Sequence, residues 1–404
     1  MTYEEVIPFV NHLKIRLSSI SLDFKRYLYN CIDWNDRLIG IKGFRGVGKT
    51  TLLLQHIKEC LADNLQQVFY ASLDDLWFRK HSLMELAECL YAHDYKYLYL
   101  DEVHKYPDWA LSIKNIYDTY PSLNIVYTGS SLLEIDNSKV DLSRRQTFYS
   151  MEGMSFREYL EYMDIIHIAP IGIEELLKSH QDIAMDISSK TKVLLHFDKY
   201  LKIGYYPFCS TVSSEISYYE KLKEVINLVV EGDLLAVENV SYPTVLKIKQ
   251  LLLAIAPNVP LVPNISKLSE QLETKSPQCL KLLYLLDRAR IVRIFTKLQK
   301  SYKHLAKPEK IFLDNSNLLY AISDYVDIGT CRETFVASQL SVDNEITMPA
   351  NGDFLVDGKH LIEVGGKGKD FSQIADLPNS YLAVANVEVG VGNRIPLWML
   401  GLLH

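Results

Sequence analysis

A glycine-rich segment, GFRGVGKTT at residues 43–51, restricts the fold of this 404-residue chain more than any other part. It follows the short apolar run RLIGI and opens the helical run LLLQHIKECL. Glycines allow consecutive backbone N–H groups to curl around phosphate oxygens at the positive end of the following helix. In this strand–loop–helix setting, the pattern Gly-x-x-x-x-Gly-Lys-Thr predicts a phosphate-binding loop for ATP.

Each residue type in this loop has an expected contact. The amine of Lys49 would reach the β- and γ-phosphates, and the hydroxyl of Thr50 would bind magnesium. We therefore expect ATP and Mg²⁺ as ligands. The residues expected to bind the nucleotide are Gly43, Arg45, Gly46, Val47, Gly48, Lys49, Thr50 and Thr51.

A second motif is the apolar run YLYL, which ends in Asp101 and Glu102. Here Asp101 would hold magnesium through water, and Glu102 would orient and polarise the attacking water. The alternative is a strand that ends in an ordinary surface Asp-Glu pair, and the upstream phosphate loop favours the functional interpretation. With His104 the string reads DEVH, which superficially resembles a helicase motif, but no other helicase motif is visible.

Two further polar groups are weaker candidates. Ser130, in TGSS after the next apolar run, could sense the γ-phosphate or could belong to a turn that closes a buried strand. The guanidinium of Arg144 or Arg145 could neutralise charge on the γ-phosphate, in its own chain or in a neighbour. An ordinary surface arginine pair is the alternative for these two residues.

The order of elements predicts an α/β fold. From residue 37 to about 150, apolar strands alternate with helices, which indicates a parallel sheet flanked by helices. Ligands of such sheets bind beyond the carboxyl ends of the strands, where these motifs fall. A helical region follows, and three helices with a strand-like run over 243–300 suggest a winged helix. We expect domains at 1–160, 161–307 and 308–404, the last a small α+β unit.

Composition indicates a cytoplasmic protein. No run of eighteen apolar residues occurs, so we expect no transmembrane helix, and the N-terminus has no secretory signal pattern. The six cysteines are scattered without CxxC pairs, as expected of reduced thiols rather than a disulfide framework or a zinc site.

Charge is distributed unevenly along the chain. The net charge is −7, which argues against wholesale binding of polyanions. The segment 267–310 nevertheless has eleven Lys or Arg residues against four acids. It is a candidate contact for DNA, and the alternative is a solvated helical face.

The motifs together resemble a family. GFRGVGKTTLL, YLYLDEVHKYPDW, YTGSSLLEI and DLSRRQTFYSMEGMSFREYL resemble the bacterial and archaeal AAA-type P-loop ATPases. The resemblance is closer to the subgroup with a C-terminal domain related to restriction endonucleases. It implies Ser130 as the sensor, Arg144 or Arg145 as the arginine finger, and a winged helix in the middle of the chain.

The C-terminal segment departs from the nuclease pattern. A PD-(D/E)xK nuclease uses a helical Glu, an Asp and a Glu-x-Lys, in which carboxylates hold magnesium and the lysine supports the reaction. The matching acids are Glu333, Asp353 and Glu363, with Gln373 on the following helix, but the lysine position holds Gly365. Lys367 or Lys369 could substitute from a bulge. The plain interpretation is an impaired or inactive nuclease.

Three functions follow from these observations. The first is a magnesium-dependent ATPase that acts as a nucleotide-driven switch, with DNA or another partner at the basic segment. The second is an ATP-regulated DNA nuclease. The third is a regulatory protein that binds nucleotide with negligible turnover. An arginine finger acting on a neighbour would require a homo-oligomer, whereas one acting within the chain would permit a monomer.

Overall fold

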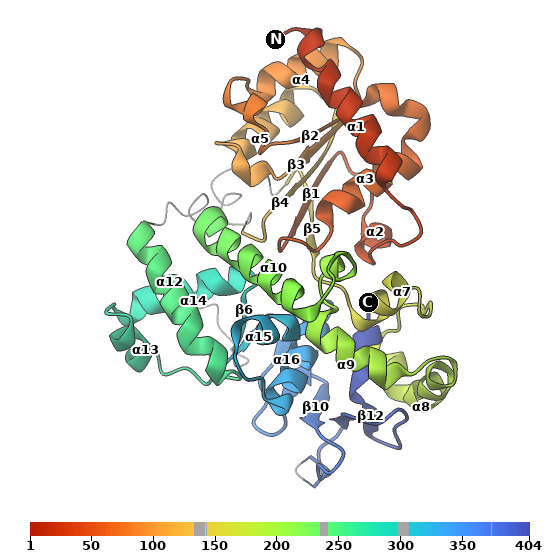
Figure 1. Cartoon of the computed structure of the whole chain (residues 1–404), viewed down its shortest axis with the longest axis vertical. Helices are drawn as coiled ribbons and strands as arrows, with labels where there is room; N and C mark the ends of the chain where they lie inside the picture. The colour runs from red at the N-terminus through yellow and green to blue at the C-terminus, as the bar shows by residue number, and fades with distance from the viewer. Residues whose placement is uncertain (133–141, 143, 235–240, 297–306, 373) are drawn as a thin grey trace. The chain divides into compact units, whose positions relative to one another are not determined.

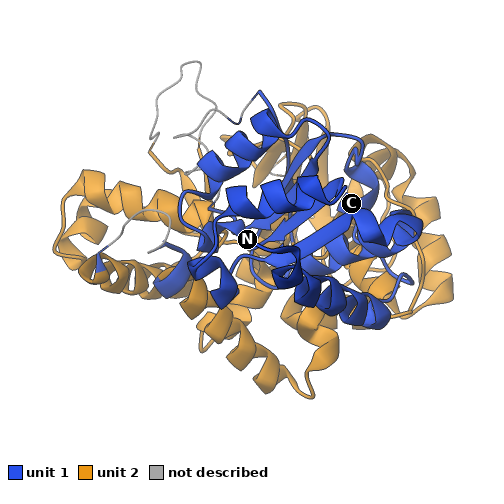
Figure 2. Cartoon of the chain, turned by 90° about the horizontal axis from the view of Figure 1, so that it is seen from above, with its two compact units in different colours: residues 1–152, 231–241 blue, residues 153–230, 242–404 orange. Residues whose placement is uncertain are grey.

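The chain forms two compact units. The computed structural model describes residues 1–132, 142, 144–234, 241–296, 307–372 and 374–404. The first unit combines residues 1–152 with 231–241, and the second combines 153–230 with 242–404 (Figure 2). The chain thus leaves the first unit, returns to it briefly, and leaves again. The expected division at residues 160 and 307 stays a prediction.

The first unit is built on a five-stranded parallel sheet in the order β2-β3-β4-β1-β5 (Figure 1). This confirms the predicted α/β fold with a parallel sheet flanked by helices. Its strands are β1 Leu38–Gly43, β2 Val68–Ser72, β3 Tyr97–Asp101, β4 Asn124–Gly129 and β5 Thr147–Met151. Its helices are α1 Ile7–Ser19, α2 Leu28–Cys31, α3 Lys49–Cys60, α4 Leu83–Ala92 and α5 Trp109–Thr119, with 3-10 turns at Tyr3–Glu5 (η1), Ala62–Gln67 (η2), Leu76–Arg79 (η3) and Val103–Lys105 (η4).

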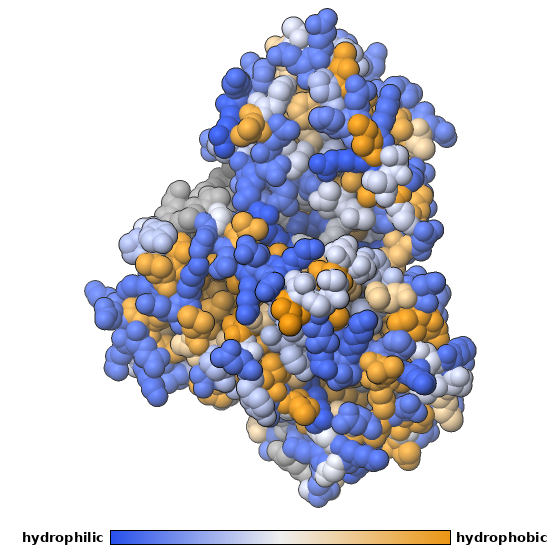
Figure 3. Space-filling model, in the orientation of Figure 1, coloured by the Kyte–Doolittle hydropathy of each residue, from blue (hydrophilic) through white to orange (hydrophobic). Residues whose placement is uncertain are grey.

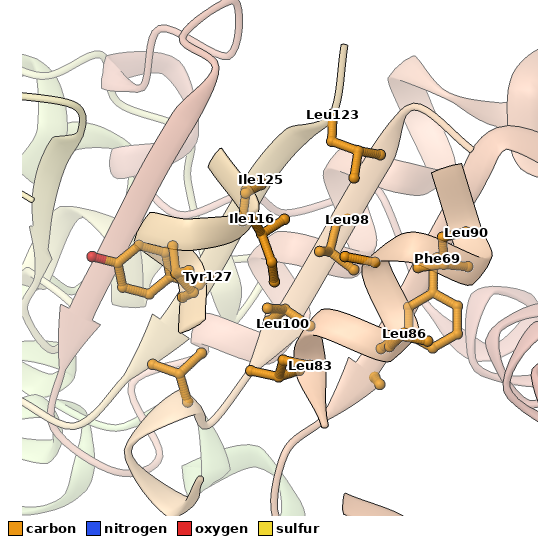
Figure 4. Close-up of a cluster of buried hydrophobic side chains, with 14 of the residues drawn as sticks. Phe69, Leu83, Leu86, Leu90, Leu98, Leu100, Ile116, Leu123, Ile125 and Tyr127 are labelled. Atoms are coloured by element: carbon orange, nitrogen blue, oxygen red, sulfur yellow. The ribbon is translucent and has the colours of Figure 1, made fainter. Parts of the chain in front are cut away.

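The core of this unit explains why the strands read as continuous apolar runs. In β1, β2, β3 and β4 nearly every residue is buried, because helices cover both faces of the sheet. Side chains of α4 and α5 pack against β2, β3 and β4 in one buried cluster (Figure 4). The last strand, β5, escaped the sequence analysis because it lies at the sheet edge and most of its residues are only half-buried.

The second unit begins with helices, as predicted. Three of them, α12 Tyr242–Ile255, α13 Ile265–Gln271 and α14 Ser276–Arg288, precede a two-stranded antiparallel sheet of β6 Val292–Phe295 and β7 Lys310–Leu313. This is the element order expected of a winged helix, and that assignment stays a prediction. The other helices are α7 Phe156–Tyr162, α8 Ile173–Lys190, α9 Val193–Ile203, α10 Glu215–Leu228, α15 Ser316–Ile322 and α16 Ile328–Leu340, with shorter turns at Pro207–Thr211 (η5), Val229–Asp233 (η6, a π-helix), Ala256–Asn258 (η7) and Leu397–Leu402 (η8).

A mixed sheet completes the second unit. Its strand order is β12-β11-β10-β9-β8, with β8 Ile346–Thr347, β9 Phe354–Val356, β10 His360–Gly365, β11 Ser380–Val384 and β12 Arg394–Pro396. The expected hairpin is present, because β9 and β10 pair antiparallel. The next pairs, β10 with β11 and β11 with β12, are parallel. Helix α16, which carries Glu333, contacts β10.

The basic segment does not form one exposed face. Arg293 is only 4% exposed, and its guanidinium donates a hydrogen bond to the carboxylate of Asp314 at 2.8 Å. Lys310 binds Glu333 at 2.8 Å. Assigning Arg293 to a basic surface is therefore wrong, because its side chain is buried and paired with Asp314. The exposed basic residues of the segment are Lys267, Lys275, Lys281, Arg288 and Lys307, while Lys297, Lys300 and Lys303 lie outside the described residues.

The described surface mixes polar and apolar side chains. Figure 3 shows hydrophilic residues in blue interspersed with small hydrophobic groups in orange on the face it presents. Scattered apolar side chains of this kind are normal on folded proteins. Among the described residues, no helix has the length and apolar character needed to cross a membrane.

The buried pair predicts the effect of substituting Arg293. Arg293→Ala leaves the Asp314 carboxylate buried without its cation, which should lower the free energy of unfolding of the second unit by about 3 kcal/mol. Urea unfolding followed by circular dichroism measures this change. The matched control Arg288→Ala removes an exposed arginine and should stay within about 0.5 kcal/mol of the wild type. Equal unfolding midpoints for the two variants would contradict the burial of Arg293.

Candidate nucleotide-binding site

The glycine-rich loop lies between strand β1 and helix α3. Gly46 and Gly48 have φ angles of 82° and 105°, a left-handed backbone that glycine adopts without strain. At Gly43 an added Cβ would lie 2.4 Å from the carbonyl oxygen of Met151 on β5, so this position has no room for a side chain. Buried Arg26 donates hydrogen bonds to the carbonyls of Val47 and Glu152 and so fixes the loop against the end of β5.

Lys49 lies inside this loop. Its ammonium group donates to the carbonyl oxygens of Gly43 at 2.8 Å and Phe44 at 3.0 Å, and the residue is only 5% exposed. Burial lowers the pKa of Lys49, while the nearby carboxylates of Glu102 and Asp101 act in the opposite direction. The loop therefore carries a desolvated cation at the place where the motif predicts phosphate contact.

Asp101 connects the loop to three strands. At the end of β3 it is 2% exposed, and its carboxylate accepts hydrogen bonds from Thr50 at 2.7 Å, from Tyr70 at 3.0 Å and from Thr128. Burial, together with the Asp101 charge, raises the pKa of Tyr70, so the phenol stays a neutral donor. The facing oxygens of Thr50 and Asp101 are the ligand type that Mg²⁺ prefers, and they fit the predicted metal.

Glu102 is the next residue, in a left-handed conformation with φ of 53°. Its backbone N–H donates to Asp101 and Thr128, both at 3.2 Å. Its side chain is 20% exposed, and one carboxylate oxygen lies 3.7 Å from the guanidinium of Arg45 and 3.6 Å from Nε2 of His104. The structure thus brings Glu102, Arg45, Lys49, Thr50 and Asp101 together within the first unit.

Ser130 follows β4 and lies beside His104. The Ser130 backbone N–H donates to Nδ1 of His104 at 3.3 Å, and its hydroxyl accepts a long hydrogen bond from the N–H of Leu132 at 3.4 Å. Because Nδ1 is an acceptor, the ring proton is on Nε2. The position at the carboxyl edge of the sheet agrees with the sensor hypothesis, and the sensing role itself stays a prediction.

The arginine pair lies at the opposite ends of the strands from the glycine-rich loop. Arg144 and Arg145 precede β5, whose first residue pairs with the start of β1, so they lie at the amino ends of the strands. The guanidinium of Arg145 forms a bidentate pair with Asp118 at 2.9 and 3.2 Å. A strand of five residues is about 16 Å long. The structure therefore does not bring these arginines to the loop of their own chain, and a role toward a neighbouring copy stays a prediction.

Asp233 is a site residue that the sequence analysis missed. It is completely buried, and its carboxylate binds Arg45 through two hydrogen bonds at 2.9 and 3.0 Å, although the residues are 188 positions apart. Lys105 contacts the same carboxylate at 2.8 Å and His104 at 3.3 Å. Burial alone would raise the pKa of Asp233, but hydrogen bonds from His104 and Arg45 outweigh it and hold the pKa well below its ordinary value. No sequence motif marks this residue.

A second cluster of charged residues lies in the second unit. Lys310 binds Glu333 at 2.8 Å and lies 3.9 Å from Asp353, while Lys369 binds Glu363 at 2.6 Å. Burial, aided by the charge of Asp353, raises the pKa of Glu333. The structure therefore brings the three predicted acids together, but with two lysines among them.

Gly365 explains how Lys369 reaches this cluster. A Cβ on Gly365 would lie 2.5 Å from the Cβ and Cγ of Lys369, so the missing side chain leaves the space that the Lys369 stem fills. Lys367 is exposed, and Gln373 lies outside the described residues. Among the described residues, no group of three His, Cys, Asp or Glu side chains is arranged to hold a metal ion. The acids of this cluster pair with Lys310 and Lys369.

Two family models match parts of this chain. Residues 35–160 match the family model of an AAA domain, and residues 194–327 match that of a domain of unknown function (DUF8612). The uncharacterized protein MJ1637 of Methanocaldococcus jannaschii is 28% identical over 362 residues, which cover 82% of this chain and 76% of that protein. Neither model description names a nuclease.

Solved structures give only a weak likeness. The replication initiator DnaA bound to AMPPCP and single-stranded DNA is 14% identical, with a TM-score of 0.27, and the match covers 69% of this chain and 86% of DnaA. The S. cerevisiae Hsp104–ADP complex is 15% identical, with a TM-score of 0.32, and the match covers 69% and 41%. By the family-model match, residues 35–160, which contain the glycine-rich loop and Asp101, are similar to AAA domains.

The bonds of Asp101 predict the effect of substituting Thr128. Thr128→Val keeps the side-chain shape but removes a hydroxyl that donates to a buried carboxylate, which should cost the first unit about 2 kcal/mol of unfolding free energy. Urea unfolding measures the loss. The control Thr119→Val changes an exposed threonine at the end of α5 and should alter stability by less than about 0.5 kcal/mol. A Thr128→Val protein as stable as this control would show that the hydroxyl does not bond Asp101.

Proposed function

We propose that the chain is a magnesium-dependent ATPase that acts as a nucleotide-driven switch. The observation that carries the proposal is the joint placement of Lys49 inside the loop, Thr50 facing Asp101 at 2.7 Å, and Glu102 directly after Asp101. A surface Asp-Glu pair would have no reason to be tied to the loop in this way.

Different residues bind the phosphates, hold the metal and activate the water. Lys49 and the loop N–H groups bind the phosphates, while Thr50 and Asp101 hold magnesium, which when bound neutralises phosphate charge. Glu102, left partly exposed and not hydrogen-bonded to Asp101 through its carboxylate, orients the attacking water and accepts its proton. Ser130 senses the terminal phosphate. Arg144 or Arg145 serves a neighbouring copy, and this role requires a homo-oligomer.

Contact with DNA is the finer part of the proposal. The exposed lysines of the basic segment, with Arg288, support it, while Arg293 and Lys310 do not contribute because they are bound to carboxylates. Charge reversal for testing DNA binding therefore belongs at Lys275 and Arg288 rather than at Arg293. A lower affinity with a flatter salt dependence is the expected result.

Two substitutions separate binding from turnover. Lys49→Ala should abolish ATP binding in titration calorimetry, because the loop loses its cation. Glu102→Gln should retain binding and lower phosphate release by about a hundredfold. Lys14→Ala, an exposed lysine on α1, is the control and should change neither quantity.

The same measurements can overturn the proposal. Normal ATP binding by Lys49→Ala would remove its basis. Phosphate release that is no faster in the wild type than in Glu102→Gln would instead favour a regulatory protein that binds nucleotide with negligible turnover.

An ATP-regulated DNA nuclease is the second candidate, favoured by the position of Lys369 over Gly365 beside Glu363. For this candidate we expect cleavage of a DNA panel in Mg²⁺ buffer that is lost in Asp353→Ala, Glu363→Ala and Lys369→Met. The control Lys367→Met, which changes an exposed lysine two residues away, should cleave normally. Intact ATP hydrolysis without any cleavage by the wild type would exclude this candidate.

A further inference from the structure

The carboxylate of Asp233 forms ion pairs with two cations of the candidate nucleotide-binding site. Its carboxylate is bound by Arg45 of the glycine-rich loop and by Lys105, which follows β3 by four residues. Arg45 also lies 3.7 Å from Glu102, and the charge of Asp233 is close enough to influence Lys49. One buried carboxylate is therefore in contact with the phosphate-binding loop and adjacent to the residue that would activate water.

The hydrogen bonds from Arg45 to Asp233 have the geometry that arginine forms with phosphate. Arg45 donates from Nε and from its terminal nitrogen to the two different oxygens, which is the bidentate geometry that arginine also forms with phosphate. One oxygen accepts three donors, from Arg45, Lys105 and His104. While Asp233 accepts the Nε–H and one Nη2–H of Arg45, a phosphate can take these same two donors only in place of the carboxylate, because each N–H points to one acceptor.

Charge balance leads to the same conclusion. The described side chains at this site include three cations, Arg45, Lys49 and Lys105, and three carboxylates, those of Asp101, Glu102 and Asp233. Asp101 faces Thr50, and Glu102 is partly exposed, so Asp233 is the carboxylate that neutralises Arg45 and Lys105. A terminal phosphate that approaches these cations is repelled by Asp233 unless the carboxylate moves away.

The segment that carries Asp233 is a π-helix. Asp233 ends a five-residue π-helix, Val229–Asp233, that continues directly from α10. π-helical turns are rare and are frequent at functional sites. The chain enters the first unit at Glu231, after 78 residues that belong to the second unit. Asp233 thus lies five residues after Leu228, the last residue of α10.

We propose that Asp233 and the terminal phosphate of ATP compete for Arg45 and Lys105. When ATP binds, its terminal phosphate replaces the carboxylate at these two cations, and residues 231–234 are released from the loop. The inference rests on the proposed function and adds how the nucleotide state is signalled. ADP lacks the terminal phosphate and leaves the Asp233 contacts in place. The opposite role, in which Asp233 holds Arg45 and Lys105 ready for phosphate, predicts the reverse effect of removing its charge.

The test compares two nucleotides on the full chain with Mg²⁺. Affinities for AMPPCP, a non-hydrolysable ATP analogue, and for ADP are measured by titration calorimetry in the wild type and in Asp233→Asn. We expect AMPPCP to bind about tenfold more tightly to the variant, with less than about threefold change for ADP. The control Asp186→Asn removes an exposed carboxylate on α8 and should change neither affinity.

A second measurement needs no variant and covers the case in which Asp233→Asn fails to fold. Amide hydrogen exchange of residues 229–234 in the wild type should become faster with AMPPCP than with ADP, because the Asp233 contacts are lost. Equal exchange with the two nucleotides, or weaker AMPPCP binding in Asp233→Asn, overturns the inference. If the wild type binds neither nucleotide, the proposed function itself fails, which is a distinguishable outcome.

Discussion

The buried carboxylate of Asp101 is the interaction on which the arrangement of the first unit depends. It accepts hydrogen bonds from Thr50 on α3, Tyr70 on β2 and Thr128 on β4. A buried charge is tolerated only when its lone pairs are satisfied, and hydrogen bonds to charged groups contribute about 1.5–3 kcal/mol each. The carboxylate therefore fixes the carboxyl ends of three neighbouring strands against the first turn of α3, so the stability of the unit and the geometry of the candidate site have the same source.

The sequence predicts those parts of the site that short motifs encode. Lys49, Thr50 and Asp101 lie where strand–loop–helix patterning places them, because the backbone of a parallel sheet directs the ends of its strands to one edge. The TGSS motif includes Thr128, but the hydrogen bonds of Thr128 and Tyr70 to Asp101 were not predicted. Both residues lie inside strands, where period-two alternation shows which face a residue occupies but not which residue of the next strand it meets.

Other features depend on contacts between distant segments. Asp233 reaches Arg45 across 188 residues, and nothing near it in the sequence indicates this. Arg293 was counted as surface charge because a count of lysines and arginines does not include the strand pairing that buries it beside Asp314. Arg144 and Arg145 follow the motifs in sequence, but they precede β5, an edge strand too polar to be recognised. They therefore lie at the amino ends of the strands, opposite to the phosphate-binding loop.

The two charged clusters balance their charge in opposite ways. In the first unit the cations Arg45 and Lys105 are held by the carboxylate of Asp233, while in the second unit the carboxylates of Glu333 and Glu363 are held by Lys310 and Lys369. Loss of its partners is costliest for the fully buried carboxylate of Asp233 and less costly for the partly exposed pairs of the second unit. A ligand that replaces one member of a pair must carry the same charge as that member. The replacing ligand must be an anion in the first unit and a cation in the second. A nucleotide triphosphate meets the first requirement through its terminal phosphate, and this makes the P-loop cluster the one whose internal pairs a nucleotide can exchange.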